Sequence, residues 1–186
     1  MVQESRLFGY LDVFRKFLIK PVNPMTIDYG NAALSVKAEP LLLRRYIMKI
    51  LLILQEFPHE CGVACLAMIG AFHGKGIRLE EYRKLFDFPT QRQSFDGLCK
   101  AAAKISLETT GVKVKELKDS LSFPCIGQLE ITEGNLHFVV IYGVGENIVI
   151  ADPARGLRLI PKNIFNKIFT GNVLLFRVKN IITKNI

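Results

Sequence analysis

The sequence from residue 55 to residue 69 is Gln-Glu-Phe-Pro-His-Glu-Cys-Gly-Val-Ala-Cys-Leu-Ala-Met-Ile. After a turn at Pro58, the residues from Cys61 to Phe72 are apolar on every face of a helix, and Gly74 follows them. A helix without a polar face is stable only when other elements cover it on all sides. The sequence therefore predicts a buried helix that begins at Cys61.

The rest of the chain predicts further helices and then a sheet. The helices are expected at residues 79–86, at 98–105 and, late in the chain, at 163–169. The second half is rich in β-branched and aromatic residues, which are typical of strands, and the expected strands are 112–114, 125–131, 137–142, 148–151 and 173–178. Gly143, Gly145 and Asn147 supply the turn of a hairpin between two of them. Helices followed by an antiparallel sheet indicate an α+β fold.

The length of 186 residues suits one domain with a complete core. Residues 1–47 are interrupted by prolines and by Gly30, without a clear helical or strand period, so we interpret them as an extension of uncertain order that catalysis does not need. The domain itself is expected at 48–180, beginning at Met48, and residues 181–186 form a tail.

The composition limits the classes of function. With 49% hydrophobic and 23% charged residues the chain resembles ordinary folded proteins. The net charge of +8 comes from scattered basic residues without the aromatic interleaving of a single-strand binder, so no nucleic-acid partner is expected. Basic residues of the extension can rest against an anionic membrane surface, which allows peripheral membrane contact; they include Arg15, Lys16, Arg44 and Arg45.

The chain has no apolar stretch of the roughly 18 residues needed to span a bilayer. It also lacks the pattern of a secretory signal peptide. We therefore expect reduced thiols. Three of the four cysteines stand in apolar surroundings, where a cysteine is usually a small buried residue, and these are Cys65, Cys99 and Cys125.

Cys61 has the setting of a nucleophile. A free thiol, with a pKa of about 8.5, supplies little thiolate at neutral pH. The start of a helix and a neighbouring imidazolium both favour the anion. Cys61 begins the predicted buried helix, and Gly62 after it lets a substrate backbone come close.

The other members of a catalytic site are expected on the hairpin. His137 begins a predicted strand, and Asp152 ends the next one before Pro153. Two adjacent antiparallel strands would bring the imidazole beside a carboxylate that orients it, as a general base requires. Gln55, six residues before Cys61, can donate its side-chain amide to an oxyanion together with the Cys61 backbone N–H.

These motifs together resemble the bacteriocin-processing peptidase family. The resemblance covers about residues 48–178 and rests on the segment 55–69, on His137-Phe-Val-Val-Ile and on Ile150-Ala-Asp152-Pro-Ala-Arg-Gly. It implies a papain-like cysteine peptidase fold without a cofactor, in a cytoplasmic domain of an ABC exporter. It also implies cleavage of precursor peptides after a double-glycine leader.

Within that resemblance Cys61 is the nucleophile, His137 the base, Asp152 its orienting residue and Gln55 the oxyanion donor. Two positions differ from the family pattern. Glu60 replaces the usual aspartate before Cys-Gly, and residues 169–171 replace a segment in which tryptophan is common.

Two other functions are consistent with some of these residues. A zinc site could use two histidines and two cysteines, but they lack a C-x-x-C pair, and the histidines flank a helix of about 18 Å; the four residues are His59, Cys61, Cys65 and His73. A non-cleaving module that only binds leader peptides is the second alternative. Because the chain contains no G-x-x-x-x-G-K-[ST] motif, an ATPase partner would lie in other chains or in further parts of a longer protein.

Overall fold

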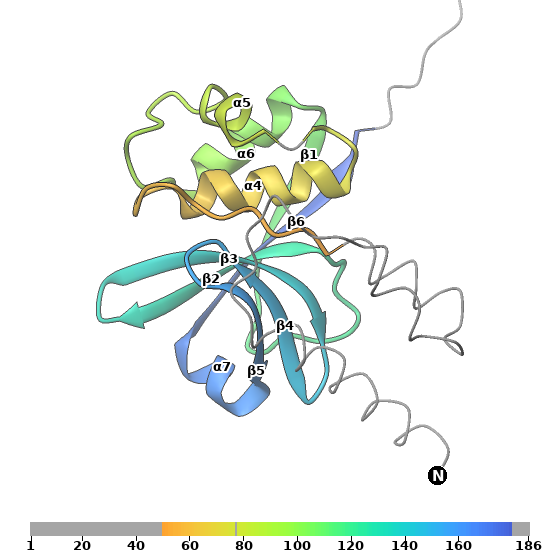
Figure 1. The fold of residues 1–186 in the computed structure, drawn as a ribbon. Coiled ribbons are helices and arrows are strands. Elements are labelled where there is room, and N and C mark those ends of the chain that lie inside the picture. The colour runs from red at the N-terminus through yellow and green to blue at the C-terminus, as the bar shows by residue number, and fades with distance from the viewer. Residues whose placement is uncertain (1–49, 77, 180–186) are drawn as a thin grey trace, which may run out of the picture. The chain divides into compact units, whose positions relative to one another are not determined.

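The computed structural model describes residues 50–76 and 78–179, so the expected extension and tail lie outside the described residues. Three helices come first: α4 (Cys61–Phe72), α5 (Leu79–Arg83) and α6 (Phe95–Lys104). Strands and one more helix follow, in the order β1 (Leu107–Lys113), β2 (Cys125–Thr132), β3 (Asn135–Val144), β4 (Asn147–Asp152), β5 (Gly156–Pro161), α7 (Lys162–Ile168) and β6 (Phe169–Val178). Figure 1 shows this arrangement.

The six strands form one sheet in the order β1-β6-β2-β3-β4-β5, and every neighbouring pair is antiparallel. The last strand, β6, lies between β1 and β2, so the end of the domain is held in the interior of the sheet. This architecture confirms the predicted α+β class, with helices in the first half and an antiparallel sheet after them.

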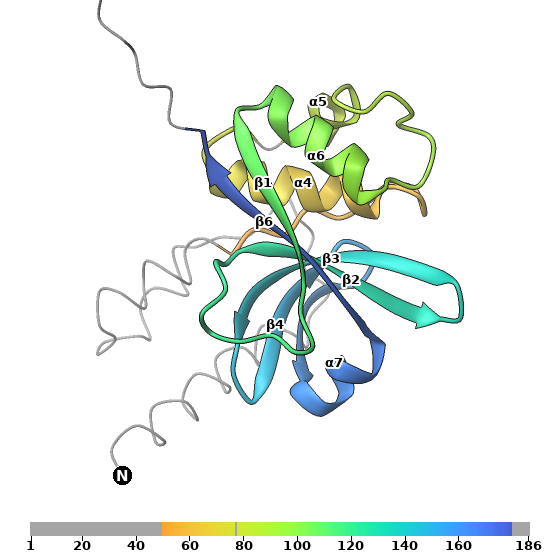
Figure 2. The ribbon, with the colours of Figure 1, turned by 180° about the vertical axis from the view of Figure 1, so that it is seen from behind.

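The helices lie on the two faces of the sheet. In the views of Figures 1 and 2, α4, α5 and α6 are grouped on one side of the strands and α7 lies apart from them. Helix α4 contacts β2 and β3, whereas α7 contacts β2, β4 and β5. Strand β3 contributes side chains to the cores on both faces of the sheet. Phe138 and Val140 pack in the core with α4, whereas Val139 and Ile141 pack in the core that contains Phe165 of α7. This alternation is the period of two that a strand requires.

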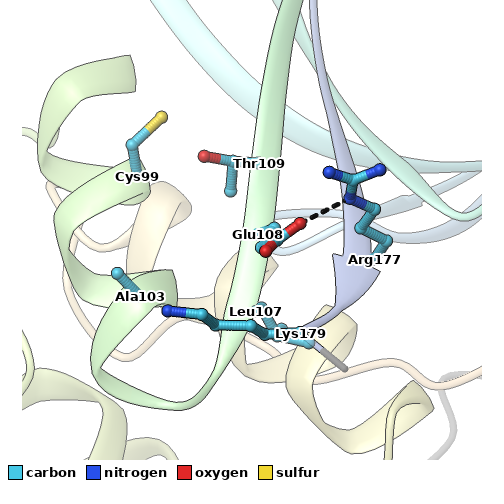
Figure 3. Close-up of a pocket in the computed structure, with 7 residues that line it drawn as sticks. All are labelled: Cys99, Ala103, Leu107, Glu108, Thr109, Arg177 and Lys179. Atoms are coloured by element: carbon cyan, nitrogen blue, oxygen red, sulfur yellow. Dashed lines mark hydrogen bonds and ion pairs between the residues drawn. The ribbon is translucent and has the colours of Figure 1, made fainter. Parts of the chain in front are cut away.

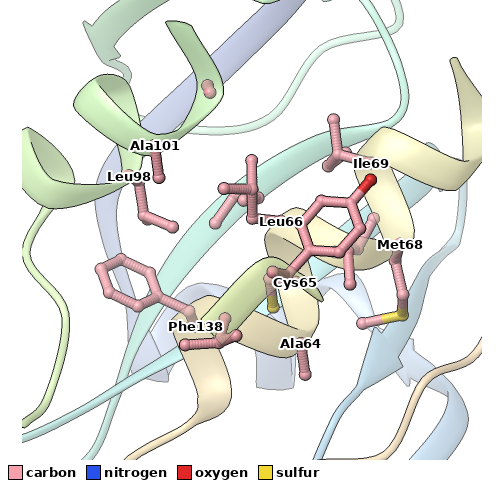
Figure 4. Packing of buried hydrophobic residues seen from close by; sticks show 14 of the residues in the cluster. Ala64, Cys65, Leu66, Met68, Ile69, Leu98, Ala101 and Phe138 are labelled. Atoms are coloured by element: carbon pink, nitrogen blue, oxygen red, sulfur yellow. The ribbon is translucent and has the colours of Figure 1, made fainter. Parts of the chain in front are cut away.

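The predicted buried helix is confirmed. The first ten residues of α4, from Cys61 to Gly70, are all buried, and both neighbouring helices contact it. Figure 4 shows its side chains packed with those of α6 and β3, among them Leu66, Leu98 and Phe138. Because sheet and helices cover α4 from different directions, its position is fixed along its whole length.

Several predicted boundaries are wrong. Helix α6 begins at Phe95, three residues earlier than expected, because the Ser94 hydroxyl accepts a hydrogen bond from the Gly97 N–H and caps it. Helix α5 ends at Arg83 and not at residue 86, and strands β1 and β6 begin earlier than expected. Strand β5 was not predicted, because its residues are partly buried without a clear alternation.

A close contact between α4 and α5 constrains Gly70. A Cβ atom at this position would overlap the hydroxyl group and the ring of Tyr82. The Tyr82 hydroxyl also donates to the carbonyl of Gly76 at 3.2 Å, which keeps the ring in place. Glycine at position 70 is therefore required by packing, inside a helix where it is intrinsically unfavourable.

We predict that Gly70→Ala lowers the free energy of unfolding by about 1–3 kcal/mol, the usual cost of overpacking. Helix propensity alone would instead raise it by about 1 kcal/mol. Chemical denaturation measures the difference. Gly97→Ala in α6 is the control, because the nearest atom to its Cβ would be the flexible end of the Gln93 side chain at 3.3 Å. Equal or higher stability of Gly70→Ala would contradict this packing.

Candidate active site

Cys61 is the first residue of α4, where backbone N–H groups have no partner within the helix and the helix dipole favours an anion. The Glu60 carbonyl accepts the first helical hydrogen bond, from the Ala64 N–H at 3.0 Å. The residue is 4% exposed, so little of it is open to solvent.

His137 and Asp152 lie on the adjacent strands β3 and β4. Val140 is paired with Ala151 across the two strands, and His137 and Asp152 both lie beyond this pair, toward the same end of the two strands. The His137 Nε2 is 2.9 Å from the Asp152 Oδ1, and the Ala154 N–H donates to the same oxygen at 2.9 Å. Because Asp152 occupies Nε2, the Nδ1 atom is the ring nitrogen that remains for Cys61.

The electrostatics of these three groups support an ion pair. Burial opposes ionisation of the Cys61 thiol. This effect is outweighed by hydrogen bonds from His137 and from the Phe138 backbone and by the charge of His137, so the thiol pKa lies below its ordinary value. Burial likewise opposes protonation of His137, yet Asp152 and Cys61 raise its pKa to about 9. Burial also opposes the Asp152 charge, and His137 and the Ala154 N–H nevertheless lower its pKa. Thiolate and imidazolium therefore coexist over a window of pH.

Gln55 is held beside the loop that follows Asp152. Its backbone N–H donates to the carbonyl of Pro153 at 2.9 Å, and its side-chain Nε2 donates to the carbonyl of Phe57 at 3.0 Å. Upstream, the Tyr142 hydroxyl accepts from the Leu51 N–H at 3.1 Å and donates to the Leu51 carbonyl at 2.9 Å, which ties the same segment to β3. An amide nitrogen carries two hydrogens, so one remains for a substrate oxygen.

The groups of the alternative zinc site are not gathered together. Within residues 50–76 and 78–179, no three His, Cys, Asp or Glu side chains are close enough to hold a metal ion. The His59 ring stacks on Phe57, and His73 packs edge-on against Phe72. All four cysteines lie in the described residues and are free thiols.

The other cysteines lack the setting of Cys61. Burial raises the pKa of Cys65, with the charges of Cys61 and Asp152 adding to it, and burial raises the pKa of Cys125 to about 12. Cys99 is less buried and lines a hollow of about 370 Å³ between α6, β1 and β6 (Figure 3). None of the predicted site residues lines this hollow.

Sequence reasoning missed the residues that surround the nucleophile. A Cβ at Gly62 would lie 2.9 Å from the Gln93 Cβ and 3.5 Å from the Phe138 ring, so the backbone beside Cys61 is closely flanked. Arg92, from the same loop as Gln93, donates to the Leu136 carbonyl at 3.1 Å and joins this loop to the β2–β3 hairpin. Glu60 and Arg83 form a further ion pair before Cys61 at 2.6 Å. Arg92 and Gln93 belong to no sequence motif, so no pattern in the sequence indicated that they lie near Cys61. For the ion pair, the available signal was the carboxylate of Glu60 directly before Cys-Gly.

The model of the peptidase C39 family matches residues 49–181. The colicin V secretion/processing ATP-binding protein CvaB of Escherichia coli is 34% identical over 72% of this chain, and the alignment covers 19% of that protein. An uncharacterised protein of Methanothermobacter thermautotrophicus is 32% identical over 67% of this chain, and the alignment covers 86% of its length. The chain thus spans about a fifth of the length of CvaB.

A solved structure agrees with these relatives. The double glycine motif protease from an AMS/PCAT transporter, in complex with the leader peptide, superposes with a TM-score of 0.63 at 34% identity, and the match covers 69% of this chain and 91% of that one. In the part of this chain that the structure describes, none of the helices is long and apolar enough to cross a membrane. The predicted family resemblance is confirmed: the chain belongs to the peptidase C39 family of cysteine peptidases.

Proposed function

We propose that this chain cleaves leader peptides after a double-glycine motif, with Cys61 as nucleophile, His137 as general base, Asp152 as its orienting residue and Gln55 as oxyanion donor. The observation that carries the proposal is the His137–Asp152 contact of 2.9 Å beside a cysteine at a helix N-terminus. The side chain of Asp152 is 1% exposed, so its charge is directed to the imidazole and not to solvent.

The first half of the reaction forms a thioester. The Cys61 thiolate attacks the carbonyl carbon of the second glycine, and the carbonyl oxygen becomes an oxyanion. The Cys61 backbone N–H and the Gln55 amide donate to this oxygen, which stabilises the tetrahedral intermediate. The imidazolium of His137 then gives its Nδ1 proton to the leaving amine, the C–N bond breaks, and the C-terminal product departs.

The second half hydrolyses the thioester. Neutral His137 accepts a proton from water at Nδ1, and the hydroxide formed attacks the thioester carbonyl. The same two donors stabilise the second oxyanion. The C–S bond breaks, the leader leaves as a carboxylic acid that loses its proton to solvent, and the thiolate–imidazolium pair is restored. Asp152 keeps the Nε2 hydrogen directed to itself through both halves.

The surroundings of Cys61 favour glycine at the cleavage site. Gln93 and Phe138 flank Gly62, and Cys61 beside it is buried. A backbone without side chains fits there, whereas a bulky residue next to the scissile bond would displace these groups. Upstream leader residues, in an amphipathic helix, would then supply most of the affinity. The neighbouring structure that holds a leader peptide supports this assignment.

An ABC exporter is the proposed partner. The relatives named as secretion and processing ATP-binding proteins support it, and so does the transporter origin of the solved neighbour. The domain would work at the inner face of the cell membrane, on the cytoplasmic side where ribosomes make the precursor peptides. The transporter and ATPase parts would belong to the same longer protein or to separate chains.

We predict that alkylation of Cys61 by iodoacetamide stays fast below pH 8, where an ordinary thiol slows about tenfold per pH unit. As the pH rises through the lowered pKa of Cys61, the thiolate fraction increases. As the pH rises through about 9, the pKa of His137, the imidazolium loses its proton. The value of kcat/KM should therefore fall above about pH 9. Mass spectrometry follows labelling in the folded chain. His137→Ala is the control, because it removes the imidazolium that offsets the effect of burial on the thiol, so labelling at pH 7 should slow. Equal labelling of both proteins would remove the ion pair from the mechanism.

Asp152→Asn should lower kcat by about 10²–10⁴-fold, the range of general acid–base contributions, with little change in KM. Gln55→Ala should lower kcat by about 10²–10³-fold, as the loss of one oxyanion donor does. Steady-state kinetics on one leader peptide measures both. A wild-type kcat for either variant would exclude that residue from the proposed roles.

The cleavage assay itself separates a peptidase from a module that only binds leaders. The wild-type chain should cut a precursor directly after Gly-Gly, and Cys61→Ala should bind it with unchanged affinity but leave it intact, because only the attacking sulfur is missing. Replacing either glycine by leucine should stop cleavage. Intact precursor with the wild-type chain would favour the binding module, and equal cutting of the leucine peptides would indicate a broader protease.

A further inference from the structure

A second buried carboxylate lies next to the proposed nucleophile. The Glu60 side chain is 2% exposed, although Glu60 directly precedes Cys61 at the start of α4. Its Oε1 accepts from the Arg83 Nε at 2.6 Å, and its Oε2 accepts from the Arg83 Nη2 at 3.1 Å. Such a two-pronged pair fixes the carboxylate in orientation as well as in position.

The same carboxylate holds the backbone of the preceding turn. The N–H groups of Glu56 and Phe57 both donate to the Glu60 Oε2 at 3.1 Å. Burial opposes the charge of Glu60, but Arg83 and these two N–H groups outweigh it and lower the carboxyl pKa. The turn between residues 56 and 60 is therefore closed by a charged group that keeps its charge at neutral pH.

The Phe57 carbonyl, which belongs to this turn, determines the orientation of the Gln55 amide. The Phe57 oxygen accepts from the Glu60 N–H at 3.1 Å and from the Gln55 Nε2 at 3.0 Å. The Gln55 Oε1 is buried without a hydrogen-bond partner among the described residues, which is costly for an acceptor. A rotated amide would place this oxygen against the Phe57 carbonyl oxygen, so the turn keeps the nitrogen where it is.

We propose that Glu60, oriented by Arg83, is a positioning residue that holds the Gln55 amide in place for the oxyanion. The inference rests on the proposed function, in which Gln55 donates to the tetrahedral intermediate. Glu60 itself contacts neither the sulfur nor the imidazole in this arrangement. Its removal should therefore weaken transition-state stabilisation and leave the thiolate–imidazolium pair unchanged.

Glu60→Gln tests this directly, because an amide has one acceptor oxygen where the carboxylate has two. We expect kcat on a Gly-Gly peptide to fall about 10–100-fold, a loss typical of a small displacement of a catalytic group, with KM and the pH profile of Cys61 alkylation unchanged. Arg83→Met is the second variant and should lower kcat in the same way, since it removes the orienting guanidinium and keeps the carboxylate.

Glu108→Gln is the matched control. Glu108 in β1 makes a contact of the same length, 2.6 Å to the Nε of Arg177 in β6 (Figure 3), and Arg177 is not a residue of the proposed site. The same chemical change there should leave kcat at the wild-type value. Thermal unfolding of all three variants separates a lower kcat from a loss of folded protein.

The decisive comparison combines Glu60→Gln with Gln55→Ala. If Glu60 acts through Gln55, adding Glu60→Gln to Gln55→Ala should change kcat by less than about twofold. An equal loss in both backgrounds, or slower Cys61 alkylation in Glu60→Gln, would overturn the positioning role and leave the proposed function intact. A wild-type kcat for Gln55→Ala alone would overturn the oxyanion assignment and this inference together.

Discussion

The burial of α4 is the constraint on which the rest of the structure depends. From Cys61 to Gly70 every residue is buried, so the helix requires cover from the sheet on one side and from α5 and α6 on the other. Its N-terminus is thereby fixed against β3, where His137 lies next to Phe138 of the core. The same packing that removes apolar surface from water thus sets the distance between sulfur and imidazole.

In the described part of the chain, buried charge is confined to this end of the helix. Among the described residues, the buried charged side chains are Glu60 and Asp152. Each is compensated by a cation and by backbone N–H groups, as the cost of burying a carboxylate requires. Asp152 acts on the imidazole, and Glu60 acts on the turn that carries Gln55. Two compensated buried charges, one directly before Cys61 in the chain and one on the imidazole beside it, indicate that this end of the domain is organised for chemistry as well as for stability.

The sequence predicted the elements with strong signals and the residues of the proposed triad. The all-apolar run from Cys61, the β-branched runs of β3 and β4, and the glycines between them each have a local cause. The Glu60–Arg83 pair could not be predicted, because 23 residues separate the partners and α5 brings them together only after packing on α4. Strand β5 was missed for a related reason: its place at the sheet edge comes from pairing with β4, and not from its own pattern. Residues 1–47 lie outside the described residues, and the boundary at Met48 stays a prediction.

An affinity label tests whether the Cys61 sulfur attacks the carbonyl carbon of the second glycine. A leader peptide that ends in a Gly-Gly chloromethyl ketone delivers its electrophile to the attacking atom, and tryptic mapping by mass spectrometry identifies the modified residue. One label per chain is expected, on Cys61, with none on Cys65, Cys99 or Cys125. A label on another cysteine, or a folded chain that stays unmodified while it binds the leader, would contradict this expectation.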